Sequence, residues 1–216
     1  MANVLLIGAT GFVGSAVLNE LVSRGNKVTT VVRNIEKLAK SDLVNAVKED
    51  VANVDAIAKL AEGKDAIISA YNPGWTNPDI ATLIIENYPK ILEAAKKSGV
   101  ERLLIVGGAD TLFCAPGLRV VDSGAIPEEI MGGVRPLGDF YLNTLMNEND
   151  IDWVFFSPAG VFDQEGKKTG NYRLGKDDLI VDAEGNSHIS VQDYADAMVN
   201  ELEKPAHHKE RFTIGY

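Results

Sequence analysis

Three glycines near the start of the chain have the spacing and position to bind a phosphate group. Gly8, Gly11 and Gly14 follow an apolar run at 4–7, and a helical pattern of apolar residues begins directly after them. Glycines lack a Cβ, so the backbone can approach a pyrophosphate closely, and the free N–H groups of the helix face its charge. The order of strand, glycine turn and helix is typical of the start of a dinucleotide-binding βαβ unit.

The spacing of these glycines is G-x-x-G-x-x-G and so meets the general G-x-G-x-x-G fingerprint only in part. An ordinary strand-to-helix turn is the alternative interpretation. The flanking pattern favours the nucleotide, because Gly25 suits the left-handed cap of the helix and a second apolar strand follows at 27–32.

The residue at the end of this second strand bears on the choice of nucleotide. Folds that prefer NAD usually place Asp or Glu here to bind the ribose 2′-hydroxyl, whereas this chain has Arg33. A guanidinium is planar and permanently charged, which suits a 2′-phosphate. The sequence therefore predicts a preference for NADP(H), with NAD(H) also possible. A solvated arginine at a strand end is the alternative.

Two more strand ends contribute candidate cofactor residues. Asp50 could meet the adenine amino group while Val51 packs on the ring, and Asp50 could also cap the helix that begins near residue 53. Ser69, Ala70 and Tyr71 end the fourth strand. We expect this place to border the nicotinamide ribose, where small residues leave room for the cofactor.

Charge and composition narrow the classes of partner. The chain has 31 acidic and 21 basic residues in 216, a formal charge of -10, which argues against nucleic acid or an anionic membrane as the main partner. Its one cysteine cannot form an internal disulfide, and the apolar start is too short for a bilayer span and lacks the basic start of a secretory signal. The sequence predicts a cytoplasmic protein, either monomer or homodimer. We expect no metal site from His188, His207 and His208, because adjacent residues rarely chelate together.

These candidate residues require a sheet whose strands end along one edge. Apolar runs predict strands at 4–7, 28–32, 45–48, 66–69, 103–106, 153–156 and 211–214. Helices are predicted at 53–61, at 78–97 with a bend or division at Pro89, from Pro136 and from a Ser190–Asp193 capping box. The alternation predicts a Rossmann-like, doubly wound α/β fold with a mostly parallel sheet. We expect residues 1–216 to form a single domain with a small C-terminal substrate-side lobe.

Two irregular segments, at about 107–136 and 160–188, begin just beyond the carboxyl ends of strands. Open α/β sheets bind ligands at that edge, so we place the substrate pocket between these segments. Surface insertions without a catalytic role are the alternative. Trp75 and Phe113 lie in loops near the expected nicotinamide end, where they could stack on a flat substrate or simply close the loops.

The chain resembles the atypical short-chain dehydrogenase/reductase family. The similar stretches are 8–14, Arg33, 50–51, 65–70 and 157–160. Within that family, 104–109 and 189–216 are similar to bacterial NADH-flavin reductases, which are relatives of biliverdin reductase B and the NmrA-like regulators. The resemblance covers essentially the whole chain. It implies a cofactor site that includes Gly8, Thr10, Gly11, Phe12 and Val13 around the pyrophosphate, Arg33 near the adenosine ribose, and Asp50, Val51, Ser69, Ala70, Tyr71, Gly107 and Pro158.

The chain departs from the catalytic pattern of the wider family, which is Tyr-x-x-x-Lys. The nearest candidate, Tyr141, is followed four residues later by Leu145, and 107–109 has no serine. Alcohol oxidation and sugar epimerisation need a positioned acid or base. Flavin reduction needs mainly alignment of the nicotinamide with an acceptor, and solvent can supply the proton.

The sequence therefore predicts an NAD(P)H-dependent reductase that acts on a flavin-like small molecule, with no assigned catalytic residue. A non-catalytic NADP(H)-binding sensor of the NmrA-like kind is an alternative, and an epimerase or dehydratase with an altered site is a second one.

Overall fold

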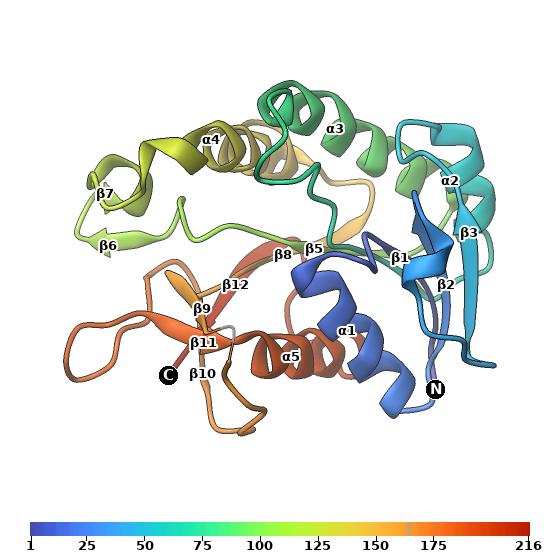
Figure 1. The fold of residues 1–216 in the computed structure, drawn as a ribbon. Helices are drawn as coiled ribbons and strands as arrows, with labels where there is room; N and C mark the ends of the chain where they lie inside the picture. Colours follow the sequence, from blue (N-terminus) through green and yellow to red (C-terminus); the bar gives the residue numbers. More distant parts are fainter. Residues whose placement is uncertain (164) are drawn as a thin grey trace.

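A computed structural model describes residues 1–163 and 165–216 of the chain. Within these residues, eight strands form one sheet in the order β10-β12-β8-β5-β4-β1-β2-β3 (Figure 1). Every neighbouring pair is parallel except β10 with β12. The sheet thus confirms the doubly wound, mostly parallel fold. Its strands are β1 (Asn3–Ile7), β2 (Lys27–Val32), β3 (Val44–Lys48), β4 (Ala66–Ser69), β5 (Arg102–Val106), β8 (Asp152–Ser157), β10 (Arg173–Gly175) and β12 (Glu210–Gly215).

Five helices cover the two faces of the sheet within the described chain (Figure 1). Side chains alternate along each strand, so Val4 and Leu6 of β1 enter one core while Leu5 and Ile7 enter the other. The first core lies under α1 (Phe12–Ser23) and α5 (Val191–Glu203). The second lies under α2 (Val54–Ala61), α3 (Ile80–Ser98) and α4 (Glu128–Asn143).

The end of α1 has the predicted glycine cap. Gly25 has φ +78°, and its N–H donates to the Val22 carbonyl at 2.9 Å, while the Asn26 N–H donates to Leu21 at 3.0 Å. These two bonds form a Schellman motif, which turns the chain directly into β2.

Two expectations about proline were wrong: a helix start near Pro136 and a division of the helix at Pro89. The fourth helix begins at Glu128 instead of Pro136, which lies inside it, and α3 runs undivided through Pro89, on its exposed face. Packing explains the early start of α4, because Gly133 lies so close to Trp75 and Ile80 that a Cβ there would meet both side chains at 2.7 Å. Tertiary contact therefore favours helix in a glycine-rich stretch with low intrinsic helix propensity.

The two irregular segments contact each other beyond the sheet edge. The first contains β6 (Phe113–Ala115) and β7 (Leu118–Arg119), and the second contains β9 (Val161–Asp163) and β10, before β11 (His188–Ser190). The Phe113 N–H donates to Asp177 O, and the Leu179 N–H donates to Phe113 O, both at 2.9 Å. Residue 164 of the second segment lies outside the described residues.

The start of α5 differs from the predicted capping box. Ser190 Oγ accepts the Asp193 N–H at 3.0 Å, as predicted, but the Asp193 carboxylate does not return the bond. It accepts hydrogen bonds instead from the Thr169 N–H and hydroxyl, the Gly170 N–H and the Tyr216 hydroxyl. Asp193, which has 0% exposure, therefore fastens the second segment and the C-terminus to α5.

Short 3₁₀ turns at Ile35–Lys37, Val120–Asp122 and Leu145–Asn147 complete the described secondary structure. Among the described residues, no helix combines the length and apolarity needed to cross a membrane.

Candidate cofactor and acceptor site

The glycine turn after β1 is tightly enclosed by backbone. Gly8 has φ +86°, a left-handed value, and a Cβ on it would overlap the Ala70 carbonyl oxygen. A Cβ on Gly14 would overlap the Gly8 carbonyl oxygen, while the Gly11 N–H donates to that same oxygen at 3.0 Å. Glycine is therefore required at 8 and 14 for α1 to start directly above the end of β1.

The N-terminus of α1 is open to a ligand. Its N-cap, Gly11, offers no side-chain cap, and the first turn contains no acidic residue in the described chain. The Ser15 N–H donates to the Gly11 carbonyl at 2.9 Å, so the amides of Phe12, Val13 and Gly14 precede the first internal bond of the helix. Thr10 and Gly11 are exposed beside them. This arrangement of free donors and positive dipole end suits a pyrophosphate.

Arg33, Asp50 and Tyr71 come together from three strand ends. Burial raises the pKa of the Tyr71 phenol, a hydrogen bond from Asn87 lowers it, and Arg33 and Asp50 lie close enough for their charges to act on it too. Arg33 is exposed, so its guanidinium is accessible to a phosphate at this edge. The structure thus places Tyr71, which was predicted to border the nicotinamide ribose, near Arg33 and Asp50, which were predicted for the adenosine end.

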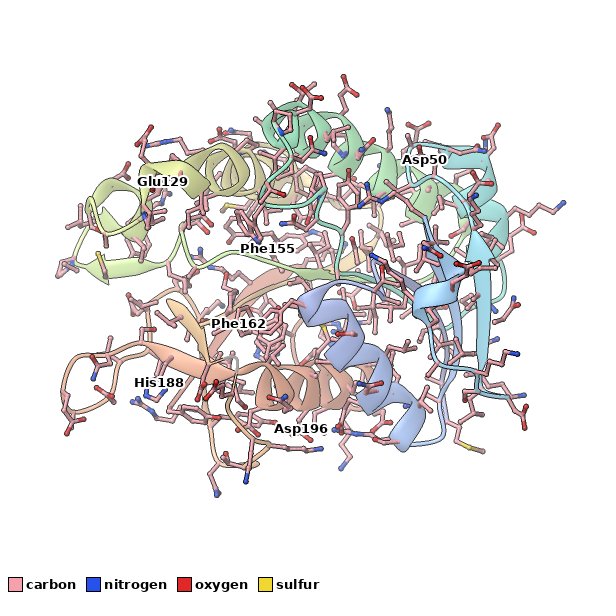
Figure 2. All side chains as sticks on the ribbon, viewed as in Figure 1. Asp50, Glu129, Phe155, Phe162, His188 and Asp196 are labelled. Atoms are coloured by element: carbon pink, nitrogen blue, oxygen red, sulfur yellow. The ribbon has the colours of Figure 1, made fainter. Side chains whose placement is uncertain are left out.

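The expectation that Asp50 caps α2 was wrong. Asn53 is the N-cap, and its Oδ1 accepts the Ala56 N–H at 3.3 Å, while Asp50 Oδ1 accepts the Ala52 N–H at 2.9 Å in a local turn. Asp50 is exposed, whereas Val51 is 8% exposed and packs into the core. Figure 2 labels Asp50 and Phe162 on opposite sides of the start of α1.

The end of β4 lies against the glycine turn. The Ala70 N–H donates to the Ile7 carbonyl at 2.9 Å, which continues the sheet beyond Ser69. Ser69 is fully buried, and the Tyr71 ring turns away to pack edge-on against Tyr88 at 5.7 Å. Backbone atoms of Ala70 and the amide nitrogen of Tyr71 therefore border Gly8 from this side.

The ends of β5 and β8 provide the next part of the edge. The Gly107 N–H donates to the Phe156 carbonyl at 2.8 Å, and a Cβ on Gly107 would lie 2.5 Å from a ring carbon of Phe155. Pro158 is buried just beyond β8. Both positions predicted for the cofactor site therefore lie at the carboxyl edge, next to the start of the irregular segments.

An aromatic contact links the glycine turn to the second segment. Phe12, which is 46% exposed, meets Phe162 edge-on at 5.7 Å. Phe162, which is labelled in Figure 2, also meets Tyr194 at 5.2 Å. Across the edge, Trp75 is 54% exposed although one side of its ring packs on Gly133. The site is thus bordered by aromatic surface on two sides.

Tyr141 is the nearest candidate in this chain for the acid/base tyrosine of the Tyr-x-x-x-Lys pattern. Its environment does not suit proton transfer. It is 5% exposed, stacked on Phe155 at 4.6 Å, and covered by the Arg211 guanidinium at 5.0 Å from the ring centre. Burial raises the pKa of its phenol. Tyr141 therefore packs in the core as a support for Arg211.

Two buried charged residues, Asp110 of the first segment and Arg211 of β12, were not predicted from the sequence. Asp110 is 3% exposed and Arg211 is 4% exposed. Arg211 donates from Nη1 to Thr111 Oγ1 at 2.8 Å and from Nη2 to Asp177 Oδ1 at 2.6 Å, so it joins both irregular segments to β12. The position of Asp110, directly after 107–109 at a strand end, is the signal that could have identified it.

Comparison with known proteins adds a family to this geometry. The profile of a family described as NAD(P)H-binding matches residues 8–205. The uncharacterized protein YwnB of Bacillus subtilis is 38% identical over 211 residues, which cover 97% of this chain and 96% of that protein.

Two solved structures are similar over nearly their full length. A Bacteroides thetaiotaomicron protein, provisionally named an epimerase, is 54% identical with a TM-score of 0.93, covering 100% of this chain and 98% of that one. A Streptococcus pneumoniae protein, provisionally named an NADH-flavin reductase, is 34% identical with a TM-score of 0.83, covering 100% and 99%.

Proposed function

This chain belongs to the NAD(P)H-binding family, and from that premise we propose that it is a reductase for a flavin or a similar conjugated small molecule. When bound, the nicotinamide cofactor supplies a hydride. The residues of the chain bind the cofactor, orient it and exclude water from one side. The observation that carries this proposal is the uncapped N-terminus of α1, which the close backbone packing at Gly8 and Gly14 places at the end of β1. At the same edge of the sheet, Tyr141 is buried beneath Arg211.

Alignment is the contribution that this site can make. The α1 amides hold the pyrophosphate, Ala70 and Gly107 leave space along the strand ends, and Phe12 with Phe162 provides an apolar wall. A conjugated acceptor needs little more than such positioning, because its ring system accepts the hydride directly. The name of the S. pneumoniae relative is consistent with this chemistry.

The name of the B. thetaiotaomicron relative favours an epimerase as a second candidate. Epimerisation of a sugar requires a group that takes a proton from a hydroxyl and returns it. Tyr141 stands at the helix position nearest to that role, but it is buried between Phe155 and Arg211. The reductase therefore fits this site better. An NADP(H)-binding sensor needs only the cofactor half of the site.

The experiment that tests the reductase follows loss of NADPH absorbance with FMN, with FAD and without an acceptor, beside calorimetric titration with NADPH and NADH. Turnover with either flavin supports the proposal. Binding without turnover favours the sensor, and conversion of a nucleotide sugar without net NADPH loss favours the epimerase. Failure to bind either nucleotide would contradict the assignment of the glycine turn.

Arg33 is proposed to favour NADPH over NADH by pairing with the 2′-phosphate. Arg33→Ala should weaken NADPH binding about 10-fold and leave NADH binding nearly unchanged, since a charge-assisted bond contributes about 1.5 kcal/mol. Lys27→Ala is the matched control, because Lys27 is an exposed cation at the opposite end of the same strand. An equal loss for both nucleotides would contradict the assignment.

A further inference from the structure

We propose that Asp110 is the proton donor of this site and gives its carboxyl proton to the acceptor atom that gains electrons from the hydride. This inference rests on the proposed reductase function. It concerns a residue of the first irregular segment that lies outside the cofactor residues described above.

Asp110 is held at the edge where the cofactor is expected. It lies four residues after the end of β5, and its carbonyl accepts the Val121 N–H at 2.9 Å. The Leu112 N–H donates to Ala109 O at 3.1 Å, which closes a turn around Asp110. The backbone on both sides is thus fixed, so the carboxyl group has a defined position beyond the strand.

Two glycines create the space that this carboxyl group occupies. A Cβ on Gly108 would overlap Asp110 Oδ1, and a Cβ on Gly138 of α4 would overlap Asp110 Oδ2. The carboxyl therefore fits between a strand-end loop and a helix, where any larger residue at 108 or 138 would displace it. Gly108 is partly exposed, and its missing side chain leaves the space next to Oδ1 open.

The hydrogen bonding of the Asp110 carboxyl group favours its protonated form. Its Oδ1 is buried and has no partner among the described residues. An ionised carboxylate with a buried, unpaired oxygen is unfavourable, whereas a protonated one keeps its hydrogen available to an incoming acceptor.

Two charged neighbours of Asp110, from two different elements, act on its pKa in opposite directions. Arg211 of β12 favours the ionised form and Asp139 of α4 opposes it. Arg211 is already bonded to Thr111 and Asp177 and lies over the Tyr141 ring. Burial is the largest influence and raises the pKa of Asp110 to about 7, although hydrogen bonds from the backbone N–H groups of Asp110 and Thr111 act to lower it.

The proposed step balances in atoms and electrons. The reduced nicotinamide gives one hydrogen and two electrons as hydride to the conjugated acceptor, and the acceptor gains a negative charge on a ring heteroatom. The O–H bond of Asp110 breaks as a new bond forms between its proton and that atom, leaving an aspartate. Solvent then reprotonates Asp110. Until it does, the positive charge of Arg211 stabilises the carboxylate.

The test compares wild type with Asp110→Asn, which keeps the size of the side chain but has no acidic proton. NADPH oxidation with FMN or FAD is measured from pH 5.5 to 9. We expect the wild-type rate to fall as pH rises through about 7, and the variant to lose about 100-fold at pH 6 with little pH dependence. Calorimetry should give unchanged NADPH affinity. Glu129→Gln is the matched control, because Glu129 is an exposed carboxylate in the first turn of the same helix, and it should keep the wild-type profile.

A second measurement reports the proton without any acceptor. Infrared difference spectra between pH 6 and pH 8 should contain the carbonyl band of a protonated carboxylic acid in wild type but not in Asp110→Asn. A band that is missing from wild type, or a variant with the wild-type rate and pH profile, overturns the proposal. Wild type that binds NADPH but reduces neither flavin overturns the reductase itself, and the assignment of Asp110 falls with it.

Discussion

Asp110 and Asp193 are both buried aspartates in contact with an irregular segment, and their surroundings are opposite. Burial acts to raise the pKa of each. Hydrogen bonds from Tyr216, Thr169 and Gly170 outweigh it at Asp193 and lower that pKa, whereas Asp110 keeps a raised pKa and an unpaired oxygen. The balance between burial and hydrogen-bond donors therefore sets the direction of each pKa shift.

The difference separates a residue that holds the fold from one that is available for chemistry. The carboxylate oxygens of Asp193 accept hydrogen bonds from Thr169, Gly170 and Tyr216, so Asp193 stabilises the second segment. Asp110 is placed in space left by two glycines and contributes few bonds to its surroundings. Perturbed groups of the second kind cluster at functional sites.

The largest expected effect comes from removing the Asp193 carboxylate. Asp193→Ala should reduce the free energy of unfolding by about 3 kcal/mol at pH 7, because the part-buried hydrogen bonds from Thr169, Gly170 and Tyr216 lose their shared acceptor. Urea denaturation measures this, with Asp139→Ala as an exposed control. A loss under about 0.5 kcal/mol would mean that Asp193 is not the structural member of the pair.

The next effect is a pH dependence of stability that Asp110 should cause. Its pKa is raised to about 7 from 3.8, so the folded protein binds the proton more tightly than the unfolded chain. Its contribution is fully present below pH 3.8 and is lost as pH rises through about 7. Wild type should lose about 2 kcal/mol more than Asp110→Asn between pH 5 and 7.5. Parallel curves of unfolding free energy against pH would remove the contrast with Asp193.

The smallest effect is expected from Tyr216→Phe. The ring remains against His188, but Asp193 and Ser190 lose their bonds to the hydroxyl. We expect a loss of about 1 kcal/mol in unfolding free energy at pH 7. The loss should disappear as pH falls below 3.8, because the lowered pKa of Asp193 makes its contribution one of the ionised form. A loss that persists in acid would assign the effect to packing.

The sequence was sufficient for the parallel strands and for the glycine turn, because these follow from local patterns, but it did not predict the antiparallel edge strand β10. Each parallel strand is a short apolar run, and Gly8, Gly11 and Gly14 mark a close approach of backbone to backbone. The start of α4 was not predictable in this way, since its glycines are poor helix formers and are selected by contacts with Trp75 and Asp110.

The same limit applies to the candidate site. Arg33, Asp50 and Tyr71 could be named because each follows a strand end, and the structure groups them. Asp110 owes its burial to α4 and its electrostatic environment to Arg211, which lies 101 positions further along the chain. No local pattern contains such a contact.

The placement of the two tryptophans gives the protein a pair of built-in optical reporters. Trp75 is half-exposed on the rim of the site, whereas Trp153 is 2% exposed in the core, with its indole N–H on the Glu148 carbonyl at 3.1 Å. A molecule that stacks at the rim would change the emission of Trp75 while leaving that of Trp153 constant, and unfolding would change both. Intrinsic fluorescence can therefore distinguish occupancy of this edge from loss of the fold in a single sample.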